Sequence, residues 1–197
     1  MLNIGVLISG GGTNLQAIID ETKSGGINGT VKLVISNKEN AYGLERARLS
    51  KIKAVCETDE DKIIELLKEN NIDLIVLAGY LKIITPKFVD EFRNKIINIH
   101  PSLIPSFCGK GYYGEKVHQG VIDYGAKVTG ATVHFVDEGA DTGAIIMQEA
   151  VNVEQDDDAK SLAKRVLEVE HRILKESIRL FCENKLSIQG RRVFINE

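Results

Sequence analysis

The chain has 197 residues, of which 43% are hydrophobic and 27% are charged, and its formal net charge is −3. This balance is typical of one globular domain with a real core and excludes an intrinsically disordered chain. The negative charge argues against a general nucleic-acid surface, which needs clustered Lys and Arg. No stretch approaches the ~18 apolar residues of a membrane span.

Short apolar runs alternate with helical patterns in the first half of the chain. Strands are predicted at Leu2–Ile8, Val31–Ser36, Ala54–Val55 and Leu74–Ala78. Helices are predicted at Thr13–Lys23, at Ala41–Ser50 with Asn40 as N-cap, and near Glu60–Asn70. Continuous apolar strands separated by helices indicate a parallel sheet that is covered on both faces.

The second half has a different pattern. Lys95–Ile99 is a fifth predicted strand, and a loop rich in Gly and Tyr leads to a helix near Glu115–Tyr124. Lys127–Val136 and Ala144–Val151 flank turn-forming residues and predict an antiparallel hairpin. A long helix is expected to begin at Asp156–Asp158, and a small strand pair to follow Gly190.

These elements predict a single α/β domain over residues 1–197, with an open, mostly parallel twisted sheet of the Rossmann-like kind. Helices are expected on both faces, with the antiparallel hairpin in the C-terminal half. Residues 1–94 would form a mononucleotide-binding half, and residues 95–197 a catalytic half on the same sheet.

Three consecutive glycines stand between the first predicted strand and the first predicted helix, in Ser9–Asn14. Glycines let backbone N–H groups approach an anion closely, and the helix N-terminus adds a partial positive charge. The segment lacks the Gly-Lys-Ser/Thr of a Walker loop, and Leu15 stands where a dinucleotide fingerprint needs a small residue. The loop therefore favours a monophosphate, with a tight turn that binds no ligand as the alternative.

Asn98 and His100 are two residues apart at the carboxyl end of a predicted parallel strand, so both side chains point to one face. An Asn amide suits an oxyanion, and His is the side chain best suited to move protons near neutral pH. A satisfied buried network explains this pair equally well. Asp141 stands in a segment that also reads as an exposed acidic turn, and His134 is as consistent with a structural role as with a functional one.

No serine lies in a nucleophile elbow, and no cluster has the spacing of zinc ligands. Asn, His and Asp without a covalent nucleophile fit the direct attack of a substrate amine on an acyl donor. The three cysteines, Cys56, Cys108 and Cys182, are odd in number, and the chain start lacks a secretory signal. Free thiols in a reducing, cytoplasmic compartment are the simplest expectation.

Several segments, taken in order, resemble the phosphoribosylglycinamide formyltransferase family. They are Val6–Ile18, Ser36–Lys38, Gly43–Ala47, Leu77–Tyr80, Asn98–Pro105 and Thr132–Gly143. The similarity continues to about Glu170-His171 and so covers nearly the whole chain. The combination is specific, although each piece alone is shared with other formyl-folate enzymes.

The resemblance implies an enzyme that transfers the formyl group of 10-formyltetrahydrofolate to the amine of glycinamide ribonucleotide in purine biosynthesis. It places a catalytic set on Asn98, His100 and Asp141. Asn98 would hydrogen-bond the developing oxyanion, and His100, supported by Asp141, would assist proton transfer. The folate is a co-substrate, and no metal is implied.

The resemblance also implies where the ligands bind. The phosphate loop matches Gly11, Gly12, Thr13 and Asn14, and Glu170 matches an acid that holds the ribose hydroxyls. The folate pocket is expected at Leu81, Lys82, Ile83, Ile84, Val136, Asp137, Glu138, Gly139 and Ala140, with His134 as a secondary site residue. The loop Cys108–Tyr113 departs from the family pattern, and neither it nor His118 is assigned a role.

These expectations define the partners as the two small-molecule substrates, with no nucleic acid and no membrane, and the chain as a monomer or homodimer. A methionyl-tRNA formyltransferase would need an added RNA-binding domain, and a formyltetrahydrofolate deformylase an added regulatory domain, and neither is expected here. A phosphometabolite-binding module without catalysis would use the glycine loop but have no use for Asn98, His100 and Asp141 together.

Overall fold

The apolar runs of the first half lie side by side as parallel strands. Leu2–Ile8 (β1) pairs with Gly29–Ser36 (β2) and with Leu74–Leu77 (β4). Lys53–Cys56 (β3) continues the sheet beyond β2, and Ile96–His100 (β5) continues it beyond β4. This computed structural model describes residues 1–196, over which the strand order is β3-β2-β1-β4-β5-β6-β7-β9-β8. The predicted α/β class with a mostly parallel sheet is confirmed.

The second half of the sheet is antiparallel where the sequence predicted a hairpin. Val128–Phe135 (β6) runs antiparallel to β5, and Ile145–Asn152 (β7) runs antiparallel to β6. A terminal hairpin of Leu186–Gln189 (β8) and Arg192–Ile195 (β9) attaches to the first residue of β7. The strand pair expected in the tail is therefore present, but it lies on both sides of Gly190 instead of following it.

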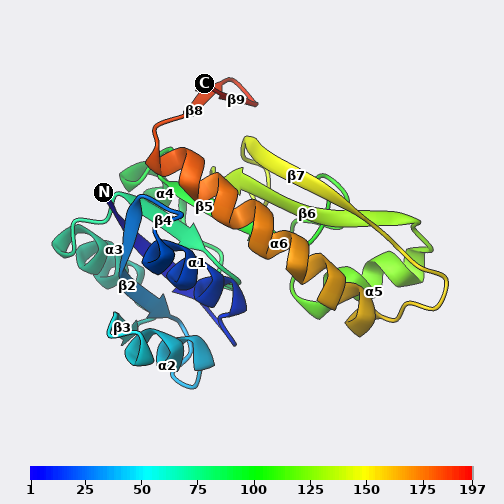
Figure 1. Ribbon diagram of the computed structural model, residues 1–197, viewed down its shortest axis with the longest axis horizontal. Helices are drawn as coiled ribbons and strands as arrows, with labels where there is room; N and C mark the ends of the chain where they lie inside the picture. Colours follow the sequence, from blue (N-terminus) through cyan, green and yellow to red (C-terminus); the bar gives the residue numbers. More distant parts are fainter. Residues whose placement is uncertain (197) are drawn as a thin grey trace.

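Helices cover both faces of the sheet (Figure 1). They are Thr13–Ser24 (α1), Tyr42–Leu49 (α2), Glu60–Glu69 (α3), Pro86–Glu91 (α4), Glu115–Tyr124 (α5) and Ala159–Cys182 (α6). Alternate residues of a buried strand point to opposite faces, so Val6 packs into the core under α1 and α6, and Leu7 into the core under α3 and α4. Two covered faces explain why these strands are apolar at every position.

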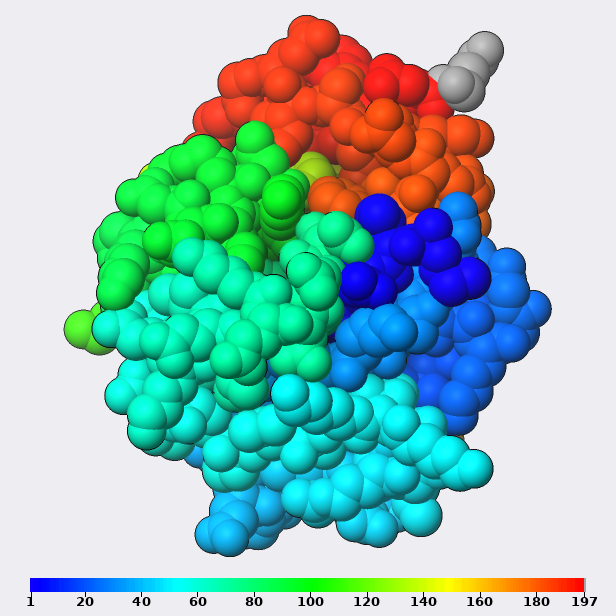
Figure 2. Space-filling model, turned by 90° about the vertical axis from the view of Figure 1, so that its left-hand side faces the viewer, coloured from blue at the N-terminus to red at the C-terminus, as the bar shows by residue number. Residues whose placement is uncertain are grey.

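The start of the chain lies close to the end of α6. Figure 2 shows the first residues, in blue, beside the orange end of α6. A Cβ atom added at Gly29, on β2, would lie 3.3 Å from the Cys182 Sγ atom at the end of α6. The last helix thus packs across the start of the chain and joins the two halves of the sheet into one body.

One local prediction was wrong, and one short helix was missed. Asn40 does not cap α2, because the helix begins at Tyr42 and its cap residue, Ala41, makes no side-chain cap bond. The first turn instead uses a loop acceptor, since the Gly43 N–H donates to the Gly10 carbonyl at 3.0 Å. The short helix α4 was not predicted, although Thr85 caps it and Pro86 begins it.

Candidate active site

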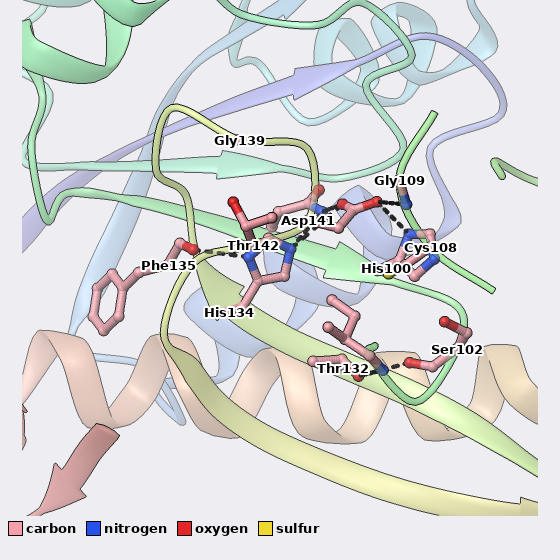
Figure 3. A network of polar contacts seen from close by, with 12 residues as sticks. His100, Ser102, Cys108, Gly109, Thr132, His134, Phe135, Gly139, Asp141 and Thr142 are labelled. Carbon is pink, nitrogen blue, oxygen red and sulfur yellow. Dashed lines mark hydrogen bonds and ion pairs between the residues drawn. The ribbon is translucent and has the colours of Figure 1, made fainter. Parts of the chain in front are cut away.

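The polar residues on β5 lie where that strand ends. Asn98 and His100 point to the same face, and antiparallel pairing places His134 of β6 directly opposite Asn98. Asp141 comes from the turn between β6 and β7. Figure 3 shows its carboxylate directed at His100 and His134. Strand pairing and one turn therefore bring these side chains together. Asn98 and Asp141, the two that are farthest apart in the sequence, are separated by 43 positions and still in contact.

His100 lies between two oxygen acceptors. Its Nε2 is 3.0 Å from the Phe107 carbonyl oxygen, and its Nδ1 is 3.6 Å from Asp141 Oδ2. Only the protonated ring can direct a hydrogen at both acceptors. Burial lowers the pKa of His100, whereas the Asp141 carboxylate and the Phe107 carbonyl oppose this effect. Burial prevails, so the pKa of His100 stays below its ordinary value, and Asp141 supplies the largest opposing effect.

Asp141 is fixed by the loop that follows β5. Its backbone has a φ of 57°, in the left-handed region, and its Oδ2 accepts a hydrogen bond of 2.8 Å from the Gly109 N–H. Burial favours the neutral acid, but the contacts with His134 and His100 and the hydrogen bond from the Gly109 N–H outweigh it and lower the pKa of Asp141. The carboxylate is therefore charged at neutral pH while its side chain is only 17% exposed.

The Asn98 amide is oriented by His134. The ring Nδ1 lies 2.8 Å from the Phe135 carbonyl oxygen, so Nδ1 carries the hydrogen and Nε2 is the acceptor. Asn98 Nδ2 donates to that Nε2 at 3.0 Å, and its second contact, with Asp141 Oδ1, is longer at 3.4 Å. One N–H of the amide is thus firmly bound, and the other is weakly held and available to a ligand.

An open cleft surrounds these side chains. It is lined by residues 79–84, 98–101, 109–114, 136–137 and 139–141, together with Leu77 and His134. Apolar groups stand exposed along one wall, with Leu81 46% exposed and Ile83 72% exposed. Exposed apolar side chains around a few converging polar groups are typical of a site that takes a flat, largely apolar ligand.

The glycine loop lies next to this cleft. The Ser9 N–H donates to the Gly79 carbonyl at 3.1 Å, and Ser9 Oγ accepts from the Leu81 N–H at 2.8 Å. Gly12 is the cap residue of α1 with a φ of 72°, a conformation that a residue with a side chain adopts only at a cost. The loop therefore directs the start of α1 toward the edge where the cleft opens.

Asn14 and Glu170 form a buried pair behind the loop. Asn14 Nδ2 donates to Glu170 Oε2 at 2.8 Å, and Asn14 Oδ1 has no hydrogen-bond partner among residues 1–196. Burial raises the pKa of Glu170 from 4.5 to about 7, and the Asn14 hydrogen bond only partly opposes it. A carboxyl group that titrates near neutral pH is thus placed beside the candidate phosphate loop.

Comparison with known proteins fits this geometry. The profile of the formyl transferase family matches residues 2–178. The chain belongs to the formyl transferase family. It is 42% identical to the phosphoribosylglycinamide formyltransferase of Haemophilus influenzae, covering 100% of this chain and 94% of that protein. It is 41% identical to the chloroplastic enzyme of Vigna unguiculata, of whose length it spans 62%.

A solved structure shows the same fold. Glycinamide ribonucleotide transformylase 1 from Symbiobacterium toebii superposes with a TM-score of 0.94 at 45% identity, covering 100% of this chain and 95% of the other. A formyltetrahydrofolate deformylase from Pseudomonas syringae has a TM-score of 0.89 at 24% identity, which shows a shared fold alone.

In this formyl transferase, the site residues predicted from sequence form two neighbouring groups, one in the cleft and one around the glycine loop. Asn98, His100, His134 and Asp141 line the cleft, as do the predicted folate segments with one exception. The exception is Glu138, which does not line the cleft and instead pairs with Arg93. Gly11, Gly12, Thr13, Asn14 and Glu170 lie on the other side, around the start of α1 and its contact with α6.

One wall of the formyl transferase cleft was missed by sequence analysis. Residues 109–114 line it, and within them Tyr112 is 38% and Tyr113 45% exposed. Tyr80 also lines the cleft, where burial raises the pKa of its phenol to about 12. A Gly- and Tyr-rich loop directly after a candidate catalytic strand was the available signal for this wall.

Among the described residues, no group of three or more His, Cys, Asp or Glu side chains is arranged to hold a metal ion. Within residues 1–196, no helix combines the length and the apolar character that crossing a bilayer requires.

Proposed function

We propose that this formyl transferase moves the formyl group of 10-formyltetrahydrofolate to the amine of glycinamide ribonucleotide, a step of purine biosynthesis. The observation that carries the proposal is the convergence of Asn98, His100 and Asp141 in one open cleft beside a glycine loop. The named relatives at about 40% identity support the same substrate pair.

In the proposed reaction, the substrate amine attacks the formyl carbon and a C–N bond forms. The bond from that carbon to the folate nitrogen then breaks, and the amine proton ends on this nitrogen. The weakly held N–H of Asn98 Nδ2 would donate to the oxyanion of the tetrahedral intermediate. Direct transfer needs no covalent enzyme intermediate, in keeping with a site built from Asn, His and Asp.

His100 and Asp141 would act together on charge and protons. A protonated His100 would stabilise the oxyanion electrostatically, and Asp141 at 3.6 Å opposes, without overcoming, the lowering of the His100 pKa by burial. The pair would in this way assist proton transfer from the incoming amine to the departing nitrogen. His134 would contribute indirectly by orienting the Asn98 amide.

The two substrates would bind at neighbouring sites, the ribonucleotide at the glycine loop and the folate in the cleft. The ribonucleotide phosphate would bind the backbone at residues 11–14, with its ribose toward Glu170. The folate would lie along Leu81–Ile84 and residues 136–140, where apolar side chains stand exposed. The division into a nucleotide half (1–94) and a catalytic half (95–197), a cytoplasmic location, a monomeric or homodimeric state and the absence of nucleic-acid partners belong to the same proposal.

A folate absorbance assay tests the function. Protein, formyl-folate and glycinamide ribonucleotide together should give deformylated folate, whereas omission of the ribonucleotide should abolish the change. Product formation without the ribonucleotide would identify a deformylase instead. An absence of turnover with both substrates, while each still binds, would identify a binding module and overturn the proposal.

A further inference from the structure

One motif of the sequence has no part in the function described so far. Gly43–Ala47 lies within helix α2, which packs on β2 and β3 and also against the glycine loop. A Cβ at Gly12 would come within 2.7 Å of the Gly43 Cα, and one at Gly43 within 2.3 Å of Ile8 Cδ1. Position 12 must therefore be glycine, because the atom it would meet is backbone, whereas a Cβ at Gly43 would meet the end of the Ile8 side chain first and the loop backbone at 3.3 Å.

Two successive carbonyl groups of the loop are held by α2. The Gly43 N–H donates to the Gly10 oxygen at 3.0 Å, and Arg46 Nε donates to the Gly11 oxygen at 2.8 Å. In a planar trans peptide, the carbonyl of one residue and the N–H of the next point in opposite directions. Holding these two oxygens toward α2 therefore turns the N–H groups of Gly11 and Gly12 away from α2.

The opposite side of the loop is open. A Cβ at Gly10 or Gly11 would meet no atom within 4 Å, and within residues 1–196 the N–H groups of Gly11 and Gly12 donate to no protein acceptor. Amides that point together into open space form an anion-binding concavity. The side of the loop that would receive a phosphate is thus set by what holds its carbonyls.

The Arg46 guanidinium is itself fixed. Besides the Gly11 oxygen, it donates from Nη1 to Gln16 Oε1 at 3.3 Å, and its Cζ lies 5.0 Å from the centre of the Tyr42 ring. Gln16 is on α1, so one guanidinium ties α2, the loop and α1 together. A planar fork with several donors can do this, whereas a lysine ammonium cannot reproduce the same geometry.

We propose that Arg46 is a positioning residue that holds the glycine loop in its anion-binding form and thereby sets the affinity for a phosphomonoester dianion. This inference rests on the proposed function for the loop's role as phosphate site. Arg46 would act by orienting the peptide groups of the loop, so a positive charge at position 46 without the planar guanidinium group is not sufficient.

The test compares Arg46→Lys and Arg46→Gln with Arg48→Gln, which removes the same charge from the same helix at a residue whose one ion pair within residues 1–196 is with Glu45. Inorganic phosphate is titrated at fixed ionic strength, and binding is followed by NMR from the backbone amides of Gly11 and Gly12. Both Arg46 variants should bind phosphate about tenfold more weakly, which is the scale of losing one charge-assisted hydrogen bond. Arg48→Gln should bind like the wild type.

Two results would overturn the proposal. If Arg46→Lys binds like the wild type and Arg46→Gln does not, the charge acts alone and position 46 has no orienting role. If all variants bind phosphate equally, Arg46 has no role in the site.

Thermal melting confirms that each variant is folded before titration. In the formyl-transfer assay, KM for the ribonucleotide should rise about tenfold at unchanged kcat. Failure of the proposed function would abolish wild-type turnover but leave the phosphate titration readable.

Discussion

Asn14 Nδ2 donates a hydrogen bond of 2.8 Å to Glu170 Oε2, and this contact joins the first helix to the last beside the glycine loop. The two residues are 156 positions apart in the chain and both are buried. One hydrogen bond from a neutral amide stabilises a buried carboxylate only weakly. Burial therefore raises the pKa of Glu170 to about 7. The pair links protein stability to pH near neutrality.

Removing this carboxyl group should change how stability depends on pH. Since the folded pKa of about 7 is above the ordinary 4.5, the native state holds more protons than the unfolded chain between these values. Stability should therefore fall as pH rises from about 4.5 to 7, by roughly 3 kcal/mol at most. Glu170→Gln, measured by urea unfolding at pH 5 and pH 8, should lose most of this slope. An equal slope in both proteins would place the titration elsewhere.

Asp141→Asn tests the charge beside His100. The substitution keeps the size of the side chain but removes the carboxylate that opposes the effect of burial, so the pKa of His100 should fall further. Single-turnover formyl transfer should slow by about a hundredfold or more, since proton-transfer catalysis is typically worth ~10²–10⁴. Binding of the ribonucleotide should persist, because its phosphate is held at the loop. Near-normal single turnover would reduce Asp141 to a turn residue.

His134→Phe tests whether the Asn98 amide needs its orienting partner. The phenyl ring fills the space but has no acceptor at the position of Nε2, 3.0 Å from Asn98 Nδ2. We expect kcat to fall about fivefold at unchanged KM, which corresponds to the ~1 kcal/mol of one hydrogen bond. His134→Gln offers an acceptor again and should recover part of the rate. If both variants have the same kcat, orientation by His134 is not the cause.

Gly11→Ala and Gly12→Ala form a matched pair for the loop backbone. A Cβ at Gly12 would collide with the Gly43 Cα at 2.7 Å, and its φ of 72° adds strain, whereas a Cβ at Gly11 meets nothing within 4 Å. Gly12→Ala should cost about 2–4 kcal/mol of unfolding free energy, and Gly11→Ala less than about 1. Chemical denaturation of the two variants checks this. Comparable losses would mean that α2 is free to move away from the loop.

Sequence pattern alone predicted the class of the sheet and its covered faces and made Asn98 and His100 candidate site residues, whereas Asp141 and the folate segments came from the family resemblance. Apolar runs without alternation can be buried only between two layers of helices, so the strands and their two covered faces followed from the apolar pattern, whereas the strand order came from the structure. Asn98 and His100 were found because a strand fixes their common face, and the carboxyl edge of a parallel sheet is where side chains meet.

Only the tertiary structure decided what each polar group contacts. Nothing local to Arg46 shows that it binds the Gly11 carbonyl, and Glu138, which sequence alone placed with the folate segments, turns instead to Arg93. Asn40 does not cap α2, because the Gly10 carbonyl, in the loop after β1, accepts the hydrogen bond from the Gly43 N–H. Hydrophobic periodicity in the sequence predicts which face of a helix or strand is buried. The hydrogen-bond partners of the polar groups discussed here lie on elements that are distant in the sequence, and only tertiary packing brings these elements into contact.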